Sequence, residues 1–129
     1  MEILDMTCAK CGYEIAMECG DKEETLFRNA LGVLKEDGLY AFFLFLHVKE
    51  KDGGKEKNRE RAPTVYDRLF DFLKRQPSLQ DLQVHADPLK AIRDNLSNNL
   101  NSLLFAKDLL ERVMVYALYH VRAKEKGGS

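Results

Sequence analysis

Three cysteines near the start of the chain are the residues whose type and spacing could do chemistry. Cys8 and Cys11 have the Cys-x-x-Cys spacing of half a zinc site or of a redox motif, and Cys19 follows further along. A structural zinc site needs four ligands, usually as two close pairs, and a redox Cys-x-x-Cys normally follows a strand of a βαβ unit. The surrounding sequence offers neither a second ligand pair nor a strand pattern.

A helical spacing gives these cysteines a different role. A helix predicted over residues 2–18 and ended by Gly20 places five residues on a single stripe: Leu4, Cys8, Cys11, Ile15 and Cys19. Free cysteine is among the most buried residue types and packs as a small hydrophobic residue. We therefore expect the three thiols to fill space in a core. A metal- or redox-sensing domain built on them is the alternative.

The rest of the chain contains no recognisable catalytic motif. There is no nucleophile elbow, no phosphate-binding glycine loop and no His-Glu-x-x-His zinc motif. His47, His85 and His120 stand in distant segments, and the acidic residues are scattered. We expect no enzyme, no metal and no cofactor, and hence a protein that acts by contact.

The signals of a second helix are complete over residues 21–38. Asp21 is a good N-cap, Glu24 stands three residues on as in a capping box, and Gly38 can take the left-handed conformation that ends a helix. Its inward face is predicted to consist of Phe27, Ala30, Leu31 and Leu34.

The next segment, Leu39–Val48, is apolar on every side. Its aromatic residues favour a strand, but no second strand-like run exists to satisfy its backbone groups. We therefore predict a helix that is buried on most of its circumference and continues into the polar Lys49-Glu50-Lys51. The charged, glycine-containing residues 49–62 indicate an exposed loop.

Proline marks the later helices. Pro63 suits the first turn of a helix that Pro77 closes, with Tyr66 and Phe70 flanking an inward stripe of Val65, Leu69, Phe72 and Leu73. A short helical turn is predicted over residues 78–84, and Asp87-Pro88 predicts an N-cap and first helical residue for the next element.

The sequence Ser97-Asn98-Asn99 indicates a break before the last helix, predicted over residues 101–124. The stripe of this helix is Leu103, Ala106, Leu110, Val113, Ala117 and Val121, widened by Leu109, Met114 and Leu118. The chain is thus predicted to form an all-α, compact single-domain bundle of about six helices over residues 1–126, followed by a flexible tail at 127–129.

The composition is that of an ordinary globular protein. Of the residues, 45% are hydrophobic and 32% are charged, and the net charge of −1 excludes an overall basic field that would attract nucleic acid. The longest apolar run, Leu39–Leu46, is less than half of the ~20 residues that span a bilayer. Acidic Glu2 and Asp5 stand where a signal peptide carries positive charge. We expect a soluble cytoplasmic protein without a membrane segment.

Basic residues nevertheless gather in the charged loop, and others follow on later helices. One interpretation is a solvated loop, since four acidic residues interleave with six basic ones there. The other is an arm that contacts RNA phosphates without reading bases. The candidate phosphate contacts are Lys49, Lys51, Lys55, Lys57, Arg59, Arg61, Arg68, Lys74, Arg75, Arg122 and Lys124.

The order of segments resembles a known family. The stretch "NALGVLKEDGLYAFFLFLHVKEK", with its Gly38-Leu39 joint, is similar to two adjoining helices of the small Cmr-type subunit of type III-B CRISPR RNA-silencing complexes. "AKCGYEIA" around Tyr13 resembles the first helix of that family. "VYDRLFDFLKR" and "LLFAKDLLERVMVYALYHVRAKEK" resemble a later helix and the long C-terminal one.

This resemblance implies a helical, non-catalytic subunit of an antiviral ribonucleoprotein. Its partners would be other protein subunits, above all the repeated backbone subunit, with weak contacts to the RNA backbone. Target cleavage would belong to the backbone subunit, and the free chain would be a monomer or self-associate weakly. The alternative is a helical adaptor or regulatory protein without a nucleic-acid role, for which a homodimer could form through the apolar "FFLFL" helix.

Overall fold

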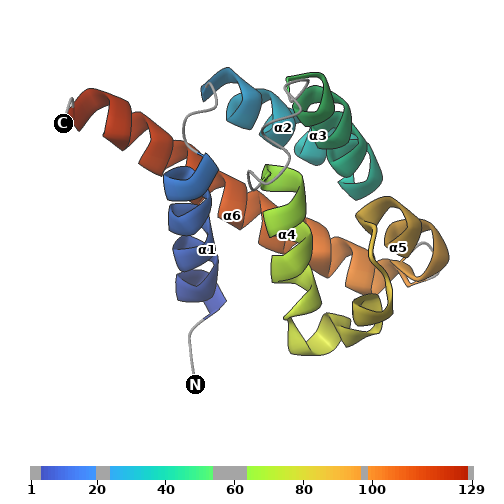
Figure 1. Cartoon of the computed structure of the whole chain (residues 1–129). Helices are drawn as coiled ribbons and strands as arrows, with labels where there is room; N and C mark the ends of the chain where they lie inside the picture. Colours follow the sequence, from blue (N-terminus) through green and yellow to red (C-terminus); the bar gives the residue numbers. More distant parts are fainter. Residues whose placement is uncertain (1–3, 20–23, 54–63, 97–98, 128–129) are drawn as a thin grey trace.

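Every regular element of the computed structural model is a helix within the residues that it describes, which are 4–19, 24–53, 64–96 and 99–127. The long helix α6 (Leu100–Gly127) runs diagonally through the view of Figure 1, where α1 and α4 stand across it and α2 lies above it. The all-α prediction is confirmed, and the predicted number of about six helices is close to the seven within the described ranges.

Helix α1 (Leu4–Cys19) crosses α6 at Gly12. A Cβ atom at Gly12 would lie 2.6 Å from the Cβ of Tyr116 and 2.8 Å from the backbone oxygen of Val113. Contacts below 3.0 Å do not occur at real Cβ atoms, so a residue without a side chain is needed where the two backbones approach. The sequence analysis did not identify this role of Gly12.

The inward face of α1 follows the predicted stripe with one exception. Cys8, Cys11 and Ile15 are buried as predicted, and the side chain of Cys19 lies outside the described part of the structure. The prediction that Leu4 faces the core is wrong, because its side chain is 40% exposed. Leu4 is the first residue of the helix, and helical side chains lean towards the N-terminus, which takes this one past the end of the core.

Gly38 joins α2 (Glu24–Asp37) to α3 (Leu39–Gly53) in the left-handed conformation, with φ of 100°. Its N–H donates to the carbonyl oxygens of Val33 and Leu34, each at 3.2 Å, and so closes the last turn of α2. The predicted helix end is therefore confirmed, whereas the predicted N-cap Asp21 lies outside the described residues. Of the predicted inward face, Phe27, Ala30 and Leu34 are buried and Leu31 is partly buried.

Helix α3 is buried on one face only, so the prediction that it is buried on most of its circumference is wrong. Leu39, Phe42, Phe43 and Leu46 are inside, whereas Tyr40, Leu44 and Val48 are exposed. The predicted continuation of the helix into Lys49-Glu50-Lys51 is confirmed, and the helix extends to Gly53, so residues 49–53 of the charged segment are not an irregular loop. Helical hydrogen bonding continues here because the segment Lys49–Lys51 consists of good helix formers. The remaining residues of the predicted loop, 54–62, lie outside the described ranges.

Helix α4 (Val65–Lys74) begins two residues after the predicted start at Pro63. The Thr64 hydroxyl accepts a hydrogen bond of 3.0 Å from the backbone N–H of Asp67, which makes Thr64 the N-cap. Pro63 itself is outside the described residues. The predicted inward stripe is confirmed, and its two flanking aromatic residues are buried as well: Val65, Tyr66, Leu69, Phe70, Phe72 and Leu73.

A 3-10 helix, η2 (Pro77–Val84), confirms the short helical turn that was predicted over residues 78–84, and it buries Leu79 and Leu82. Helix α5 (Pro88–Asp94) begins as predicted, with the Asp87 carboxylate accepting from the backbone N–H of Lys90 at 3.1 Å. The predicted break separates α5 from α6. Helix α6 ends at Gly127, so this residue is helical and not part of the predicted tail. The predicted stripe is buried except for the partly buried Leu103.

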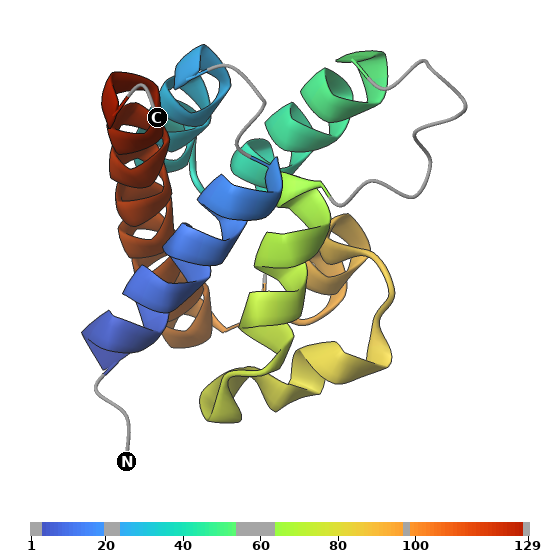
Figure 2. The same ribbon diagram turned by 60° about the vertical axis from the view of Figure 1, so that its left-hand side comes forward.

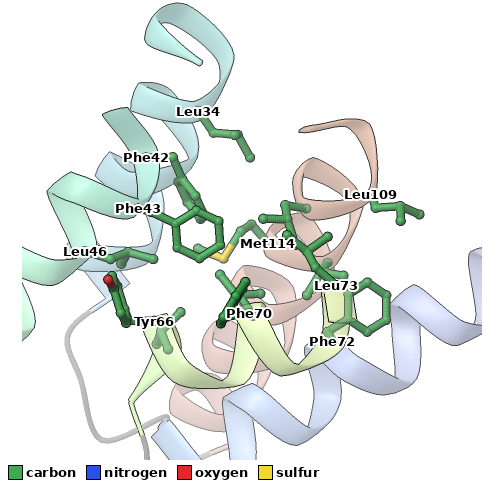
Figure 3. Packing of buried hydrophobic residues seen from close by; sticks show 14 of the residues in the cluster. Leu34, Phe42, Phe43, Leu46, Tyr66, Phe70, Phe72, Leu73, Leu109 and Met114 are labelled. Atoms are coloured by element: carbon green, nitrogen blue, oxygen red, sulfur yellow. The ribbon is translucent and has the colours of Figure 1, made fainter. Parts of the chain in front are cut away.

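The core is a single cluster with members from every one of these helices. Figure 3 shows its aromatic part, in which rings from α3 and α4 meet the sulfur-bearing side chain of Met114 from α6. Phe43 makes edge-to-face contacts with Tyr66 and Phe70, with ring centroids 5.8 and 6.5 Å apart. In the described part of the chain, no helix combines the length and apolar character that crossing a membrane requires.

Candidate nucleic-acid interface

The structure describes the side chains of six of the candidate phosphate contacts. Lys55, Lys57, Arg59 and Arg61 lie outside the described residues, and Lys51 lies in α3 with a side chain that is not described. The six described side chains come from α3, from the first turn and the end of α4, and from the last turns of α6: Lys49, Arg68, Lys74, Arg75, Arg122 and Lys124.

Lys74 and Arg75 line one surface depression where α4 ends and η2 begins. The depression has a volume of about 370 Å³ and is also lined by Asp71 and Gln83. The side-chain amide of Gln83 donates a hydrogen bond of 3.0 Å to the backbone oxygen of Lys74, which holds η2 against the end of α4. Gln83 was not among the predicted site residues, because only folding brings it next to α4.

The charge at this depression favours an anion. Lys74 lies with its Nζ atom 4.7 Å from the centre of the Phe70 ring and 4.0 Å from the Asp71 carboxylate. Arg75 is exposed. Two cations against one carboxylate leave a net positive charge, which the partial negative charge at the C-terminal end of α4 reduces but does not cancel. Such an arrangement can hold one backbone phosphate without recognising a base.

Arg68 forms an ion pair with another residue of the same chain. Its Nη2 atom lies 2.6 Å from the Glu18 carboxylate, so the pair connects α4 to α1. The Nε atom of Arg68 is buried and has no hydrogen-bond partner in the described structure. Because both side chains are about 40% exposed, this ion pair contributes little to stability, and a phosphate could replace the carboxylate at small cost.

Arg122 belongs to a different group of charges. Its Nε atom donates to the Glu24 carboxylate at 2.7 Å, and Arg28 donates to the same oxygen at 3.1 Å. The hydrogen bond from Arg122 is the main cause that lowers the pKa of Glu24. These residues and the exposed Lys124 lie near the C-terminal end of α6, far from the end of α4 in both Figure 1 and Figure 2. The predicted cations whose side chains the structure describes therefore do not form one continuous surface.

Lys49 is exposed on α3, and its Nζ atom lies 5.8 Å from the centre of the Phe45 ring. The neighbouring Glu50 points to α4 instead. Its carboxylate accepts hydrogen bonds from the backbone N–H groups of Val65 at 2.8 Å and of Tyr66 at 3.0 Å. Lys49, the predicted phosphate contact, and Glu50, which caps α4, are thus adjacent residues with different roles.

Tyr66 continues this polar network to α5. Its hydroxyl donates a hydrogen bond of 2.7 Å to Asp87, the N-cap of α5. Burial, followed by this hydrogen bond, raises the pKa of the Tyr66 phenol. Both carboxylates of the network hold helix ends. The sequence analysis identified Asp87 as a cap but had no signal for Glu50, which caps a helix other than its own.

The thiols of Cys8 and Cys11 are free and buried. Burial raises the pKa of Cys8 to about 11 and that of Cys11 to about 12, so both thiols are protonated at neutral pH. The Sγ atom of Cys8 lies 3.9 Å from the backbone oxygen of Leu109 on α6. Within the described ranges, no three His, Cys, Asp or Glu side chains converge as metal ligands would.

Comparison of the chain with known proteins adds no relative: no family model, no curated protein and no solved structure matches it significantly.

Proposed function

We propose that this chain is a non-catalytic structural subunit of a type III-B CRISPR RNA-silencing ribonucleoprotein in the cytoplasm. In this role it packs against the repeated backbone subunit and contacts RNA phosphates weakly. The observation that carries the proposal is the pair Lys74 and Arg75 at one depression of a chain whose net charge is −1. The resemblance of the helix order around the Gly38 joint supports the choice of complex.

A non-catalytic role is supported by the structural use of the reactive groups. The thiols of Cys8 and Cys11 are buried and protonated. The Glu50 and Asp87 carboxylates cap helices, and the phenol of Tyr66 is bound to Asp87. These thiols, carboxylates and phenol stabilise the fold. We infer that the protein acts through contacts of its outer surface with other molecules.

The proposed RNA contact is weak and depends on salt. Each phosphate that a lysine or arginine neutralises on a single strand contributes about −0.7 to the slope of log affinity against log salt. The variant Lys74→Gln/Arg75→Gln removes both cations at the depression. Because the depression holds one phosphate, the slope of this variant for single-stranded RNA should be about 0.7 less steep than that of the wild type.

The experiment has two parts. The tagged chain is purified from its native host, and the bound proteins and RNA are identified; a guide RNA and the backbone subunit are expected. Binding of single-stranded RNA is then measured over a salt series for the double variant and for the control Lys35→Gln/Lys90→Gln. Both control residues are exposed and lie on α2 and α5. A chain that is recovered without RNA and without partner subunits would contradict the proposal.

A further inference from the structure

The ion pair of Arg68 with Glu18 uses only one of the two donors on an edge of the guanidinium. The Nη2 atom of Arg68 lies 2.6 Å from the Glu18 carboxylate, whereas the Nε atom is buried and has no hydrogen-bond partner in the described structure. The N–H group of Nε and one N–H group of Nη2 point in the same direction, and together they fit two oxygens of one anion. Arg68 therefore has a donor that Glu18 does not satisfy.

The Glu18 carboxylate is not firmly fixed at Arg68. Glu18 belongs to the last turn of α1, and its side chain is 40% exposed. An ion pair at such exposure gains little over the two hydrated ions, so Glu18 can turn into solvent when a stronger ligand reaches Arg68. A phosphate is such a ligand, because it accepts hydrogen bonds from both donors of the guanidinium edge and is not tied to a helix.

Arg68 lies on the same side of α4 as Arg75, the C-cap of this helix, which lines the depression described above. Seven residues separate the two arginines, which is nearly two full helical turns and about 10.5 Å along the axis. Burial raises the pKa of Cys11 to about 12, and both guanidinium groups lie close enough to this α1 thiol to oppose that shift. Both arginines are therefore on the side of α4 next to α1. The end of α1 meets the start of α4 in Figure 1 and in Figure 2.

The charges on this side of α4 favour phosphates only when Glu18 has turned away. Three cations, Arg68, Lys74 and Arg75, then stand against two carboxylates, Asp71 and Glu14. The Asp71 carboxylate is 4.0 Å from the Nζ atom of Lys74, and Glu14 is exposed on α1. With Glu18 in place, three carboxylates balance the three cations. A net positive surface along a helix can follow the backbone of a single strand.

We propose that Arg68 binds a second phosphate of the RNA strand whose first phosphate lies at Lys74 and Arg75, and that Glu18 occupies Arg68 as an internal substitute while RNA is absent. This inference rests on the proposed function, because it concerns the same strand, and it adds a regulation of affinity. Glu18 must leave before the second phosphate binds. The competition lowers the apparent affinity for RNA.

Binding of a fluorescently labelled oligouridylate to the full chain, measured over a salt series, tests the proposal. Glu18→Gln should bind more tightly than the wild type, because Arg68 is then free to contact a phosphate. Its slope of log affinity against log salt should be about 0.7 steeper, since one more phosphate is neutralised. The ratio of the two affinities should therefore fall about threefold as the salt concentration rises from about 50 to about 200 mM.

Two comparisons separate the role of Arg68 from the general repulsion between a carboxylate and RNA. Glu14→Gln removes the same charge from an exposed position of the same helix without freeing Arg68, so its slope should equal that of the wild type. In an Arg68→Gln background, Glu18→Gln should give less than its gain in the wild type. General repulsion predicts the opposite, because Glu18 would be unpaired there and its removal would matter more.

Arg68→Lys tests the need for two parallel donors. Combined with Glu18→Gln, it keeps the positive charge but not the guanidinium edge, so only part of the gain in affinity should remain. Circular dichroism checks that each variant is folded. We expect all of them to fold, because the exposed pair of Arg68 with Glu18 contributes little to stability.

Three outcomes would overturn the proposal: Glu18→Gln binds as the wild type does, its gain is undiminished by Arg68→Gln, or Glu14→Gln steepens the slope equally. The Lys74→Gln/Arg75→Gln variant reports separately on the proposed function. If that variant loses salt dependence while Glu18→Gln gains nothing, only the competition by Glu18 is refuted. If neither the wild type nor any variant binds the oligouridylate, both proposals are refuted.

Discussion

The Glu50 carboxylate accepts a hydrogen bond of 3.0 Å from the backbone N–H of Tyr66, so α3 supplies part of the N-terminal cap of α4. The other oxygen of the same carboxylate accepts from Val65, and Thr64 accepts from Asp67. The first three N–H groups of α4 are thereby satisfied, two of them by a residue of the preceding helix. The Glu50 carboxylate thus links the end of α3, which precedes residues 54–63, to the start of α4, which follows them.

Replacing Glu50 by alanine should destabilise the protein. Val65 and Tyr66 would both lose their acceptor at a buried helix start, which should cost about 1–2 kcal/mol, the range measured for lost N-caps. Urea denaturation of Glu50→Ala measures this loss. Glu14→Ala, at an exposed position of α1, is the matched control and should change stability by less than about 0.5 kcal/mol. Equal stabilities of the two variants would contradict the capping role.

The two glycines Gly12 and Gly32 should respond in opposite ways to alanine. Gly12→Ala inserts a Cβ atom 2.6 Å from that of Tyr116, and overpacking of this kind should cost about 1–3 kcal/mol. At Gly32, in the middle of α2, a Cβ atom would meet no other atom within 4 Å. Gly32→Ala should therefore stabilise the helix by up to about 1 kcal/mol. Thermal unfolding of both variants is the measurement, and a stabilised Gly12→Ala would refute the close crossing of α1 and α6.

Stability should decrease in alkaline solution in a way that depends on Tyr66. Burial and the hydrogen bond to Asp87 raise the pKa of Tyr66 above its ordinary value of 10.0. The contribution of this group is therefore fully present below pH 10.0 and is lost as the pH rises towards the folded-state pKa, because the unfolded phenol ionises first.

Tyr66→Phe tests this dependence. The variant should be less stable than the wild type by about 1–2 kcal/mol near neutral pH, because Asp87 loses a hydrogen-bond donor. This difference should shrink above pH 10.0. Denaturation curves at several pH values measure it, with Tyr119→Phe at an exposed position of α6 as the control. A difference that stays constant with pH would show that Tyr66 does not titrate differently in the folded state.

Cys8 and Cys11 should be protected from thiol reagents in the folded protein. Both side chains are buried, and their pKa values of about 11 and about 12 leave almost no thiolate at about pH 8. Both should react fully after denaturation. Mass spectrometry of the labelled protein identifies which cysteine has reacted. Rapid labelling of either residue in the folded state, or a tightly held zinc ion in the purified protein, would contradict the packing role.

Much of the fold could be predicted because local signals and the tertiary structure agree. Gly38 ends α2, and Asp87 with Pro88 begins α5, since each of these residues acts through its own backbone or nearest turn. The start of α4 was predicted wrongly because Pro63 and Thr64 both favour a helix start, and the Thr64 hydroxyl takes the capping position. The exposure of Leu4 depends on where the core ends, which no local pattern contains.

The candidate interface could be predicted only as a set of cations. Whether a cation is held by a carboxylate depends on distant residues: Glu18 faces Arg68, and Glu24 faces Arg122, from other helices. The grouping of Lys74 with Gln83 depends on how η2 turns back against α4. These pairs join residues that are far apart in the chain, and helical periodicity carries no information on them.

The close crossing at Gly12 also fixes the number of residues between Asp5 and Gly12 in α1. Asp5 accepts a hydrogen bond of 2.7 Å from the Tyr116 hydroxyl, so α6 is contacted on both sides of the Cys8 position. One residue inserted between Asp5 and Gly12 would rotate the first turn by about 100° relative to the crossing. Asp5 would then turn away from the Tyr116 hydroxyl. Substitutions on the outer face of α1 are thus compatible with the fold, whereas insertions and deletions between these two residues are not.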